Sequence, residues 1–350
     1  MRLDVLRSDE VAEAPSRWVG AILCRDVLGP GGRPARLKGH RLERADALVL
    51  EASGEDELHL LWLDPGDVDE DTAAVRLAAA VAGEGVRAGR PVESQVRLSA
   101  GHRGLLRVDA RALDAMNSIT DVTVFALPDG IPIDAGRAVA GVKITPLGIA
   151  EAVLAGAERQ AGAGVHAGHV MTVRRFLPLT VSAVVRERLD ASARARFETS
   201  LRAKVAWFGG RAGEVVYAAG DRAATRDALL EAAQGADIVL AVGVASTDPL
   251  DVTWQAALEA GAVEVRRGLP VHPGSSYWIA TLEGRHAIGV ASCGMFSRRT
   301  ALDLLLTRLF AGEQLDQGFL AGLGHGGLLA PQMAWRFPGY SETPAAEEER

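Results

Sequence analysis

The chain has 350 residues, enough for two or three domains and at least one large core. Its composition, 48% hydrophobic and 24% charged, is typical of a globular protein, and its net charge of -7 argues against a nucleic-acid partner, which usually requires a basic footprint. The two cysteines, Cys24 and Cys293, are far apart and lack metal-ligand spacing, which argues against a disulfide scaffold and a cysteine-type zinc site.

Residues 1–150 are expected to form a β-rich accessory region of one or two small units. Strands are predicted at ELHLLWLD and at VTVFALPDG, where alternating apolar positions indicate a half-buried sheet. The region's clearest helix is DEDTAAVRLAAAVAG, with Asp71 or Thr72 as its cap and Gly83 at its end. The acidic run DVDED at 67–71 either binds a divalent cation or begins this helix, and the helix start explains it already.

Residues 151–169 are expected to form a linker that begins as the helix EAVLAGAERQA. Strands and helices then alternate over residues 170–312. The predicted elements are strand LTVSAVV, helix ASARARFETSLRAKVAWF, strand GEVVYAA, helix RAATRDALLEAAQG, strand ADIVLAV, helix PLDVTWQAALEAG, strand AVEVRR, hairpin SYWIATL-EG-RHAIGV and helix SRRTALDLLLTRLFAG. This pattern predicts a three-layer α/β/α domain with a mainly parallel sheet. Residues 313–350 are a Gly- and Pro-rich tail, and the composition of SETPAAEEER predicts a disordered end.

The first residues, MRLDVLRSDEVAEAP, lack the apolar core of a signal peptide. No apolar run approaches the roughly 20 residues that a membrane span needs. We therefore expect a cytoplasmic protein with no membrane segment.

The loop after the strand ADIVLAV is the first candidate site, because ligands of open parallel sheets bind at the carboxyl ends of strands. Gly243 lets the backbone approach a ligand closely, and Ser246 and Thr247 add hydroxyl donors. Asp248 is a candidate N-cap followed by a proline suited to the first helical position, and Asp251 comes three residues after the cap. A helix N-terminus attracts anions. The alternative is that the two aspartates only cap a helix and the glycine only makes a turn.

The loop between the last strand and the last long helix is the second candidate site. It contains Ser292 and Gly294, and Ser297 is a candidate cap for the helix that follows. Arg298 and Arg299 would then lie in its first turn, where cations oppose the helix dipole. They either point into solvent or meet an anionic ligand, and simple solvation is favoured for at least one of them.

Between these loops, Pro273 and Gly274 predict a turn, and Ser275 and Ser276 offer hydroxyl groups. A plain turn before a strand explains this segment equally well. Cys293 has no histidine or acid tied to it by a motif, so a buried structural cysteine is favoured over a nucleophile. The chain has no Walker A loop, no Gly-x-Ser-x-Gly and no His-Glu-x-x-His.

The run ADIVLAVGVASTDPLDVTWQAALEAGAVEVRRGLPVHPGSSYWIATLEGRHAIGVASCG resembles the molybdopterin-binding domain shared by molybdopterin molybdenumtransferases of the gephyrin E-domain type and molybdopterin adenylyltransferases. More narrowly, GAILCRDVLGPGGRPARLKGHRL and ALDAMNSITDVTVFALPDGIPIDAGRAVAGVKITPLGI resemble the molybdopterin-binding module that some bacteria fuse to a molybdenum cofactor cytidylyltransferase. The resemblance is best over 120–150 and 236–312 and weaker over 15–45 and 170–235.

The resemblance implies a pterin-phosphate ligand, either molybdopterin or the molybdenum cofactor. The loop at 243–248 and the helix start would hold its terminal phosphate, or the nucleotide of an adenylylated form, with Ser246 and Thr247 as hydrogen-bond donors. Asp248 and Asp251 are the candidates for a role toward Mg²⁺ or molybdate. The resemblance also implies a homodimer, and a cytidylyltransferase or a molybdoenzyme as partner.

The chain departs from the family pattern at several positions. The molybdenumtransferases have two adjacent glycines where this chain has Gly243 and Val244, and a Pro-Gly-Asn-Pro segment where it has residues 292–295. After the first strand they carry Thr-Gly-(Asp/Asn)-Glu, of which only Glu187 remains here. Because the chain keeps fewer of the family's acidic residues, binding of the cofactor is favoured over catalysis.

Two hypotheses of different classes follow. The first is a molybdopterin-binding enzyme that inserts molybdate; the second is a non-catalytic carrier that presents the cofactor to another enzyme. A third, weaker alternative is a nucleotide-binding enzyme of unrelated chemistry on a similar sheet. The arrangement of Asp248, Asp251 and Glu187 discriminates between the enzyme and the carrier. Carboxylates that converge on one pocket would favour catalysis, and carboxylates that point apart and act as helix caps would favour the carrier.

Overall fold

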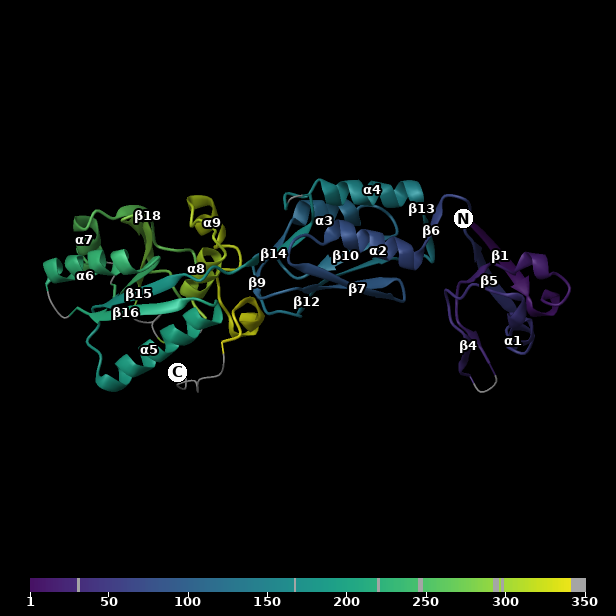
Figure 1. The fold of residues 1–350 in the computed structure, drawn as a ribbon, viewed down its shortest axis with the longest axis horizontal. Helices are drawn as coiled ribbons and strands as arrows, with labels where there is room; N and C mark the ends of the chain where they lie inside the picture. The colour runs from purple at the N-terminus through teal and green to yellow at the C-terminus, as the bar shows by residue number, and fades with distance from the viewer. Residues whose placement is uncertain are drawn as a thin grey trace. The chain divides into compact units, whose positions relative to one another are not determined.

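The computed structural model describes residues 1–29, 32–166, 168–218, 221–244, 248–291, 296 and 299–340. In this part the chain is mixed α/β, as the sequence predicts, with helices and several separate sheets (Figure 1). It divides into two compact units. Unit 1 comprises Met1–His102, Leu106–Asp129 and Asp134–Val173, and unit 2 comprises Arg103–Leu105, Gly130–Ile133 and Arg174–Arg350.

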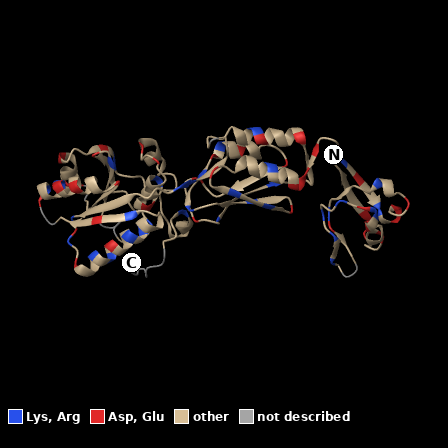
Figure 2. Ribbon diagram, in the orientation of Figure 1, with Lys and Arg blue, Asp and Glu red and all other residues tan. Residues whose placement is uncertain are grey.

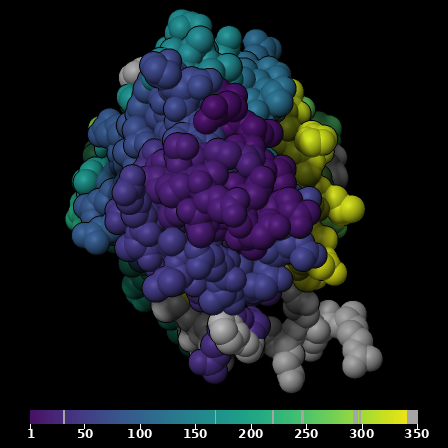
Figure 3. Space-filling model, turned by 90° about the vertical axis from the view of Figure 1, so that its right-hand side faces the viewer, coloured from purple at the N-terminus to yellow at the C-terminus, as the bar shows by residue number. Residues whose placement is uncertain are grey.

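The N-terminal part of unit 1 is a small β structure with its own core. Strand β1 (Arg2–Arg7) pairs antiparallel with β5 (Glu57–Trp62), and β5 pairs with β2 (Ile22–Leu23). This part forms one compact body, purple in Figure 3. The core consists of Leu6, Val11, Trp18, Ala21, Leu23, Val27, Leu42, Leu50, Leu58 and Leu60. The other elements are η1 (Ser8–Glu10), η2 (Pro15–Arg17), β3 (Val27–Leu28), β4 (Pro34–Arg36), η3 (Arg44–Asp46) and α1 (Ala47–Glu51).

Asp46 organises the turn before α1, because its buried carboxylate accepts three hydrogen bonds. Arg36 Nε donates to Oδ1 at 2.6 Å, and His40 Nε2 and the backbone N–H of Glu43 lie 2.9 and 2.8 Å from Oδ2. Burial raises the pKa of the Asp46 carboxyl, but the bonds from Glu43, His40 and Arg36 outweigh it and hold this pKa below its ordinary value.

The lowered pKa predicts how Asp46 contributes to stability as the pH changes. Its contribution is complete above the unfolded pKa of about 3.9 and is lost as the pH falls through the lower folded pKa. We expect the Asp46→Asn variant to be less stable than the wild type near pH 7, with the difference shrinking below about pH 4. Urea denaturation over this pH range measures the effect, and a stability difference that is independent of pH would contradict the assignment.

The remainder of unit 1 contains a four-stranded antiparallel sheet of order β10-β12-β8-β7, with α2, α3 and α4 on one side of it (Figure 1). The strands are β6 (Asp67–Asp69), β7 (Val86–Val92), β8 (Gln95–Ala100), β9 (Gly104–Val108), β10 (Val122–Ala126), β11 (Pro132–Ile133), β12 (Ala138–Ile144), β13 (Gly148–Ala150) and β14 (Met171–Arg175), of which β9, β11 and β14 include residues of unit 2. The helices are α2 (Glu70–Val81), α3 (Ala110–Asn117) and α4 (Glu151–Gly162).

The caps of α2 and α3 differ from the sequence prediction. Asp69, not Asp71 or Thr72, caps α2, and its Oδ1 accepts the N–H of Thr72 at 3.0 Å. The acidic run therefore begins a helix, with its cap two or three residues earlier than predicted. Helix α3 is not predicted by the sequence analysis at all, although Asp109 caps it by accepting two backbone N–H groups.

Unit 2 is built on a six-stranded sheet of order β16-β15-β17-β20-β19-β18. Strands β15, β16, β17 and β20 are parallel, and β19 is antiparallel to its neighbours β18 and β20. Every residue of β15 and β17 is buried, as expected for central strands covered on both faces. Figure 1 shows α5 and α6 on opposite sides of β15 and β16. The strands are β15 (Thr180–Val185), β16 (Arg211–Tyr217), β17 (Ile238–Val242), β18 (Val263–Arg267), β19 (Trp278–Leu282) and β20 (Arg285–Val290).

The helices of unit 2 are α5 (Ala191–Trp207), α6 (Arg222–Gly235), α7 (Val252–Glu259), α8 (Ala301–Phe310) and α9 (Gln317–Gly322), followed by the 3-10 helix η5 (Pro331–Arg336). The predicted hairpin is confirmed: Leu282 pairs with Arg285 around a two-residue turn, in which Glu283 and Gly284 have φ values of 50° and 74°. The Gly- and Pro-rich residues 313–340 pack on this unit and bury Leu320 and Phe337.

Charged residues of both signs are interspersed along the helices, as α2 and α5 show (Figure 2). Among the residues that the structure describes, no helix combines the length and the hydropathy needed to cross a membrane.

Candidate anion-binding site

The carboxyl ends of β15, β16, β17 and β20 lie at one edge of the unit 2 sheet, because these strands are parallel. Val185, Val242 and Val290 are the last residues of β15, β17 and β20 and are paired in one row. The chain leaves β15 toward β16 on one side and leaves β17 toward β18 at the far edge of the sheet. The strand order therefore reverses between β15 and β17, and open α/β sheets bind ligands at such a reversal. The carboxyl ends of β15 and β17, with the residues that follow them, are called the crevice below.

Gly243 lies in this crevice, directly after β17. Its φ of +90° is one that residues with a side chain rarely adopt. A Cβ built on Gly243 would lie 3.0 Å from the backbone nitrogen of Glu187 and 3.1 Å from its Oε2. Glu187 follows β15, so the two loops pack backbone to backbone, and only glycine fits between them without a shift.

The two candidate aspartates after Gly243 each bind a backbone N–H group. Asp248 is exposed, and its Oδ1 accepts the N–H of Leu250 at 2.8 Å. Asp251 is 8% exposed, and its Oδ1 accepts the N–H of Trp254 at 2.9 Å. Asp251 is thus the N-cap of α7, and the prediction of a cap at Asp248 with a helix from the following proline is wrong by three residues.

The cap predicts what replacing Asp251 does. We expect Asp251→Ala to lower the free energy of unfolding by about 1 kcal/mol, because the N–H of Trp254 loses its acceptor. Asp251→Asn should restore most of that loss, since asparagine caps helices about equally well. Urea denaturation measures both, alongside ligand titration. Equal losses in the two variants would show that the charge of Asp251, and not the cap, matters.

The predicted turn at Pro273 and Gly274 lies at the same edge, because β19 starts there and pairs through Trp278 with Gly289 near the end of β20. Gly274 has φ +120°, and a Cβ on it would lie 2.4 Å from the Cβ of Ala301. The N–H of Ala301 donates to the carbonyl of Pro273 at 3.1 Å. The turn therefore rests on the first residue of α8.

The serines of this turn differ in exposure, since Ser275 is exposed and Ser276 is half-buried. Thr300 caps α8 in a capping box with Asp303. The helix therefore starts later than the sequence predicts, and Arg299 precedes it. The predicted site residues Ser246, Thr247, Ser292 and Gly294, with Ser297 and Arg298, lie outside the described residues.

Among the residues that the structure describes, three buried donors near this edge have no hydrogen-bond partner: Arg186 Nε, Thr253 Oγ1 and Trp278 Nε1. Arg186 follows β15, Thr253 is the second residue of α7, and Trp278 begins β19. Leaving a buried donor unsatisfied is costly, so such groups mark places where a ligand or water binds. Sequence reasoning missed all three. Only Arg186, a cation placed directly after a buried strand, carried a signal that points to an anion.

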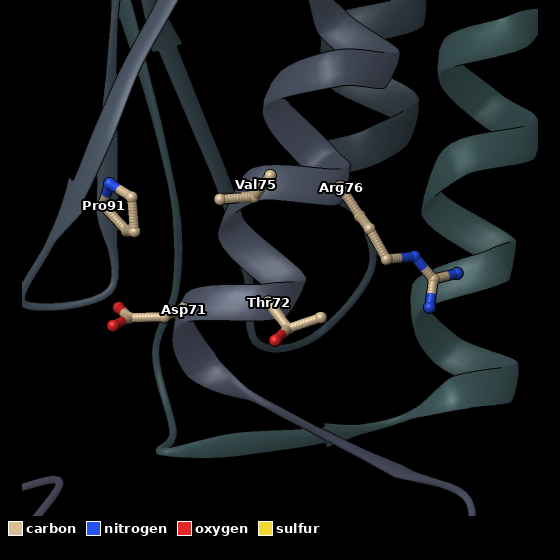
Figure 4. A pocket seen from close by; sticks show the side chains of 5 residues that line it. All are labelled: Asp71, Thr72, Val75, Arg76 and Pro91. Carbon is tan, nitrogen blue, oxygen red and sulfur yellow. The ribbon is translucent and has the colours of Figure 1, made fainter.

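Unit 1 has a shallow hollow between α2 and β7, lined by Asp71, Thr72, Val75, Arg76 and Pro91 (Figure 4). Arg76 points toward α4, where its Nη1 and Nη2 lie 2.6 and 2.8 Å from carboxylate oxygens of Glu151 and Glu158. These two acids already satisfy the cation, so the hollow offers an anion no free charge. Among the described residues, no group of three or more His, Cys, Asp or Glu side chains is placed to hold a metal ion.

No family model and no curated protein matches the chain. Solved structures similar to it include the molybdopterin biosynthesis MoeA protein from Pyrococcus horikosii, with 11% identity, a TM-score of 0.28, and coverage of 89% of this chain and 76% of that one. A molybdenum cofactor biosynthesis protein from Pyrococcus furiosus has 11% identity and a TM-score of 0.25, over 89% of this chain and 66% of that one. The CinA protein of unknown function from Thermoplasma acidophilum has 14% identity and a TM-score of 0.22, over 33% of this chain and 89% of that one. Values this low carry no argument about function.

Proposed function

We propose that this chain binds the phosphate end of molybdopterin or the molybdenum cofactor and takes part in the synthesis or handling of that cofactor. The observation that carries the proposal is the end of the sheet between β15 and β17, where Gly243 packs against Glu187 and, among the described residues, the buried Nε of Arg186 has no hydrogen-bond partner. The ligand class comes from the sequence resemblance over residues 236–312. On this proposal, residues 170–312 are a three-layer α/β/α domain that forms a homodimer.

The residues at this edge fit a phosphate group in two respects. The start of α7 presents backbone N–H groups and a partial positive charge. Arg186 and Thr253 supply further donors from the neighbouring elements. Ser246 and Thr247 would add hydroxyl groups, and Pro273, Gly274, Ser275, Ser276, Ser292 and Gly294 would form the opposite wall.

A carrier role is favoured over catalysis by the use made of the two aspartates. Asp248 and Asp251 each accept a different backbone N–H, because Asp251 caps α7 and Asp248 closes the turn before it. A carrier would shield the cofactor and pass it to a cytidylyltransferase or to a molybdoenzyme.

Molybdate insertion is the second candidate, because the carboxylate of Glu187 lies beside Gly243 in the crevice. In that case Asp248 and Asp251 would act toward Mg²⁺ or molybdate, with the metal as Lewis acid and template, although the described Glu187, Asp248 and Asp251 do not form a metal-binding group. The products would be the loaded cofactor and, from an adenylylated pterin, AMP.

The experiment is titration calorimetry of the purified chain with molybdopterin and with adenylylated molybdopterin, each with and without Mg²⁺ and molybdate. Tight binding without AMP release is the result that a carrier predicts. AMP release that requires both ions would instead identify a molybdenumtransferase. Failure to bind either pterin would refute both functions.

A further inference from the structure

The C-terminal strap, defined as residues 313–340, follows a fixed path over unit 2. Leu320 and Phe337 anchor it with 0% and 5% exposure. Arg336 Nη1 donates to the carbonyl of Gly326 at 2.6 Å and so closes the bend within the strap. Glu313 and Gln317 contact β14, β18 and the C-terminal end of α8. Further contacts of the strap fall on the residues before the Pro273–Gly274 turn and on the start of α8, which border the candidate site.

The first contact holds the residues before the Pro273–Gly274 turn. The N–H of His272 donates to the carbonyl of Gly327 at 2.8 Å, and the N–H of Leu329 donates to the carbonyl of His272 at 2.9 Å. A Cβ on Gly327 would lie 2.2 Å from the carbonyl oxygen of Pro270, so this close approach requires glycine. The strap thus fixes the backbone on which the turn is built.

The second contact holds the start of α8, on which Gly274 rests. The hydroxyl of Tyr340 donates to Asp303 Oδ1 at 2.8 Å, and the N–H of Thr300 donates to Asp303 Oδ2 at 2.8 Å. The Tyr340 ring lies 4.9 Å from Lys204 Nζ, which pairs with the same carboxylate. Burial and the Asp303 carboxylate raise the pKa of Tyr340, so its hydroxyl remains a donor at neutral pH.

A third contact joins the strap to Arg299, the residue before the N-cap Thr300 of α8. Arg299 Nη1 donates to the carbonyl of Pro331 at 3.3 Å. The turn and the helix start touch each other through Gly274 and Ala301. The strap therefore contacts both the residues before the turn and the start of α8.

We propose that the C-terminal strap is a positioning element for the candidate site, through its bonds to His272 and Asp303. In this role Gly327 and Tyr340 act on ligand affinity without being part of the site. The effect on ligand affinity rests on the proposed function. The effect on the wall, which is residues 270–277 and 300–303, does not.

The test uses the full chain with Gly327→Ala and Tyr340→Phe, and with Gly322→Ala as the matched control, because a Cβ on Gly322 meets nothing within 4 Å. Amide hydrogen exchange is followed in residues 270–277, in residues 300–303 and in β17. We expect exchange about tenfold faster in the two wall segments of Gly327→Ala and no change in β17, since local opening is independent of the sheet. Tyr340→Phe keeps the ring and should loosen residues 300–303 alone.

Molybdopterin titration of the same variants gives the second measurement, and we expect affinity to fall about tenfold in Gly327→Ala and not in Gly322→Ala. The proposal is overturned if exchange of the wall stays at the wild-type rate, if β17 loosens equally, or if the wall loosens with affinity unchanged. If the wild type binds no pterin, the proposed function fails, and the exchange measurement still decides whether the strap holds the wall.

Discussion

Replacing Asp303 with alanine should lower the free energy of unfolding by about 3–5 kcal/mol, because it leaves a buried ammonium group without its partner. The side chains of Lys204 and Asp303 are 5% and 0% exposed, and they pair directly. The variant also removes the acceptor for Tyr340 and half of the capping box of α8. Urea denaturation of the full chain measures the loss.

The matched control is Asp227→Ala, which breaks an exposed pair with Arg226 in α6, where the aspartate side chain is 64% exposed. We expect that change to stay within about 0.5 kcal/mol of the wild type. Joint replacement of Lys204 by Met and Asp303 by Leu should recover much of the loss, since no charge is then left unpaired. Losses in Asp303→Ala no larger than in Asp227→Ala would show that the buried pair does not stabilise unit 2.

The second large effect is expected at Gly243, where alanine should weaken molybdopterin binding about tenfold or more. A side chain in this left-handed conformation costs about 1–2 kcal/mol, and the added methyl group also meets the backbone of Glu187. The loop must shift to relieve both, and it directly follows β17 at the proposed site. Titration calorimetry measures the affinity of each variant.

Gly235→Ala is the control for this change, because a Cβ on Gly235 meets nothing within 4 Å. It should bind like the wild type and should be no less stable, since alanine favours the helix that Gly235 ends. If Gly243→Ala binds molybdopterin as tightly as Gly235→Ala does, the crevice between β15 and β17 is not the site.

The sheet of unit 2 could be predicted because its strands are short apolar runs, and glycines stand at the ends of several of its helices. Helix starts were harder to predict. Asp248 and Asp251 are both good caps, and the intervening Pro249 suits a first helical position. In the structure Asp248 closes a turn through the N–H of Leu250, and the carbonyl of Asp248 accepts the N–H of Asp251. These local bonds delay the helix by three residues.

Contacts between distant positions explain what the sequence did not predict. The fixed conformation of residues 313–340 depends on the contacts of Tyr340 with Asp303 and of Gly327 with Pro270. No local sequence pattern predicts either contact. The sequence marks Glu187 as the remnant of a family motif and as a possible partner of Asp248 and Asp251, but it does not indicate a contact with Gly243. Its packing against Gly243 follows from the sheet order, which places β15 beside β17.

We expect the site at Gly243 to recognise a phosphate group on a pterin. The most direct measurement is titration calorimetry of the wild-type chain with molybdopterin and with the same pterin after enzymatic removal of its phosphate. We predict micromolar or tighter binding of molybdopterin and an affinity at least about tenfold weaker for the dephosphorylated pterin, as the loss of charge-assisted hydrogen bonds requires. Equal affinity for the two pterins, or binding of neither, would contradict the claim.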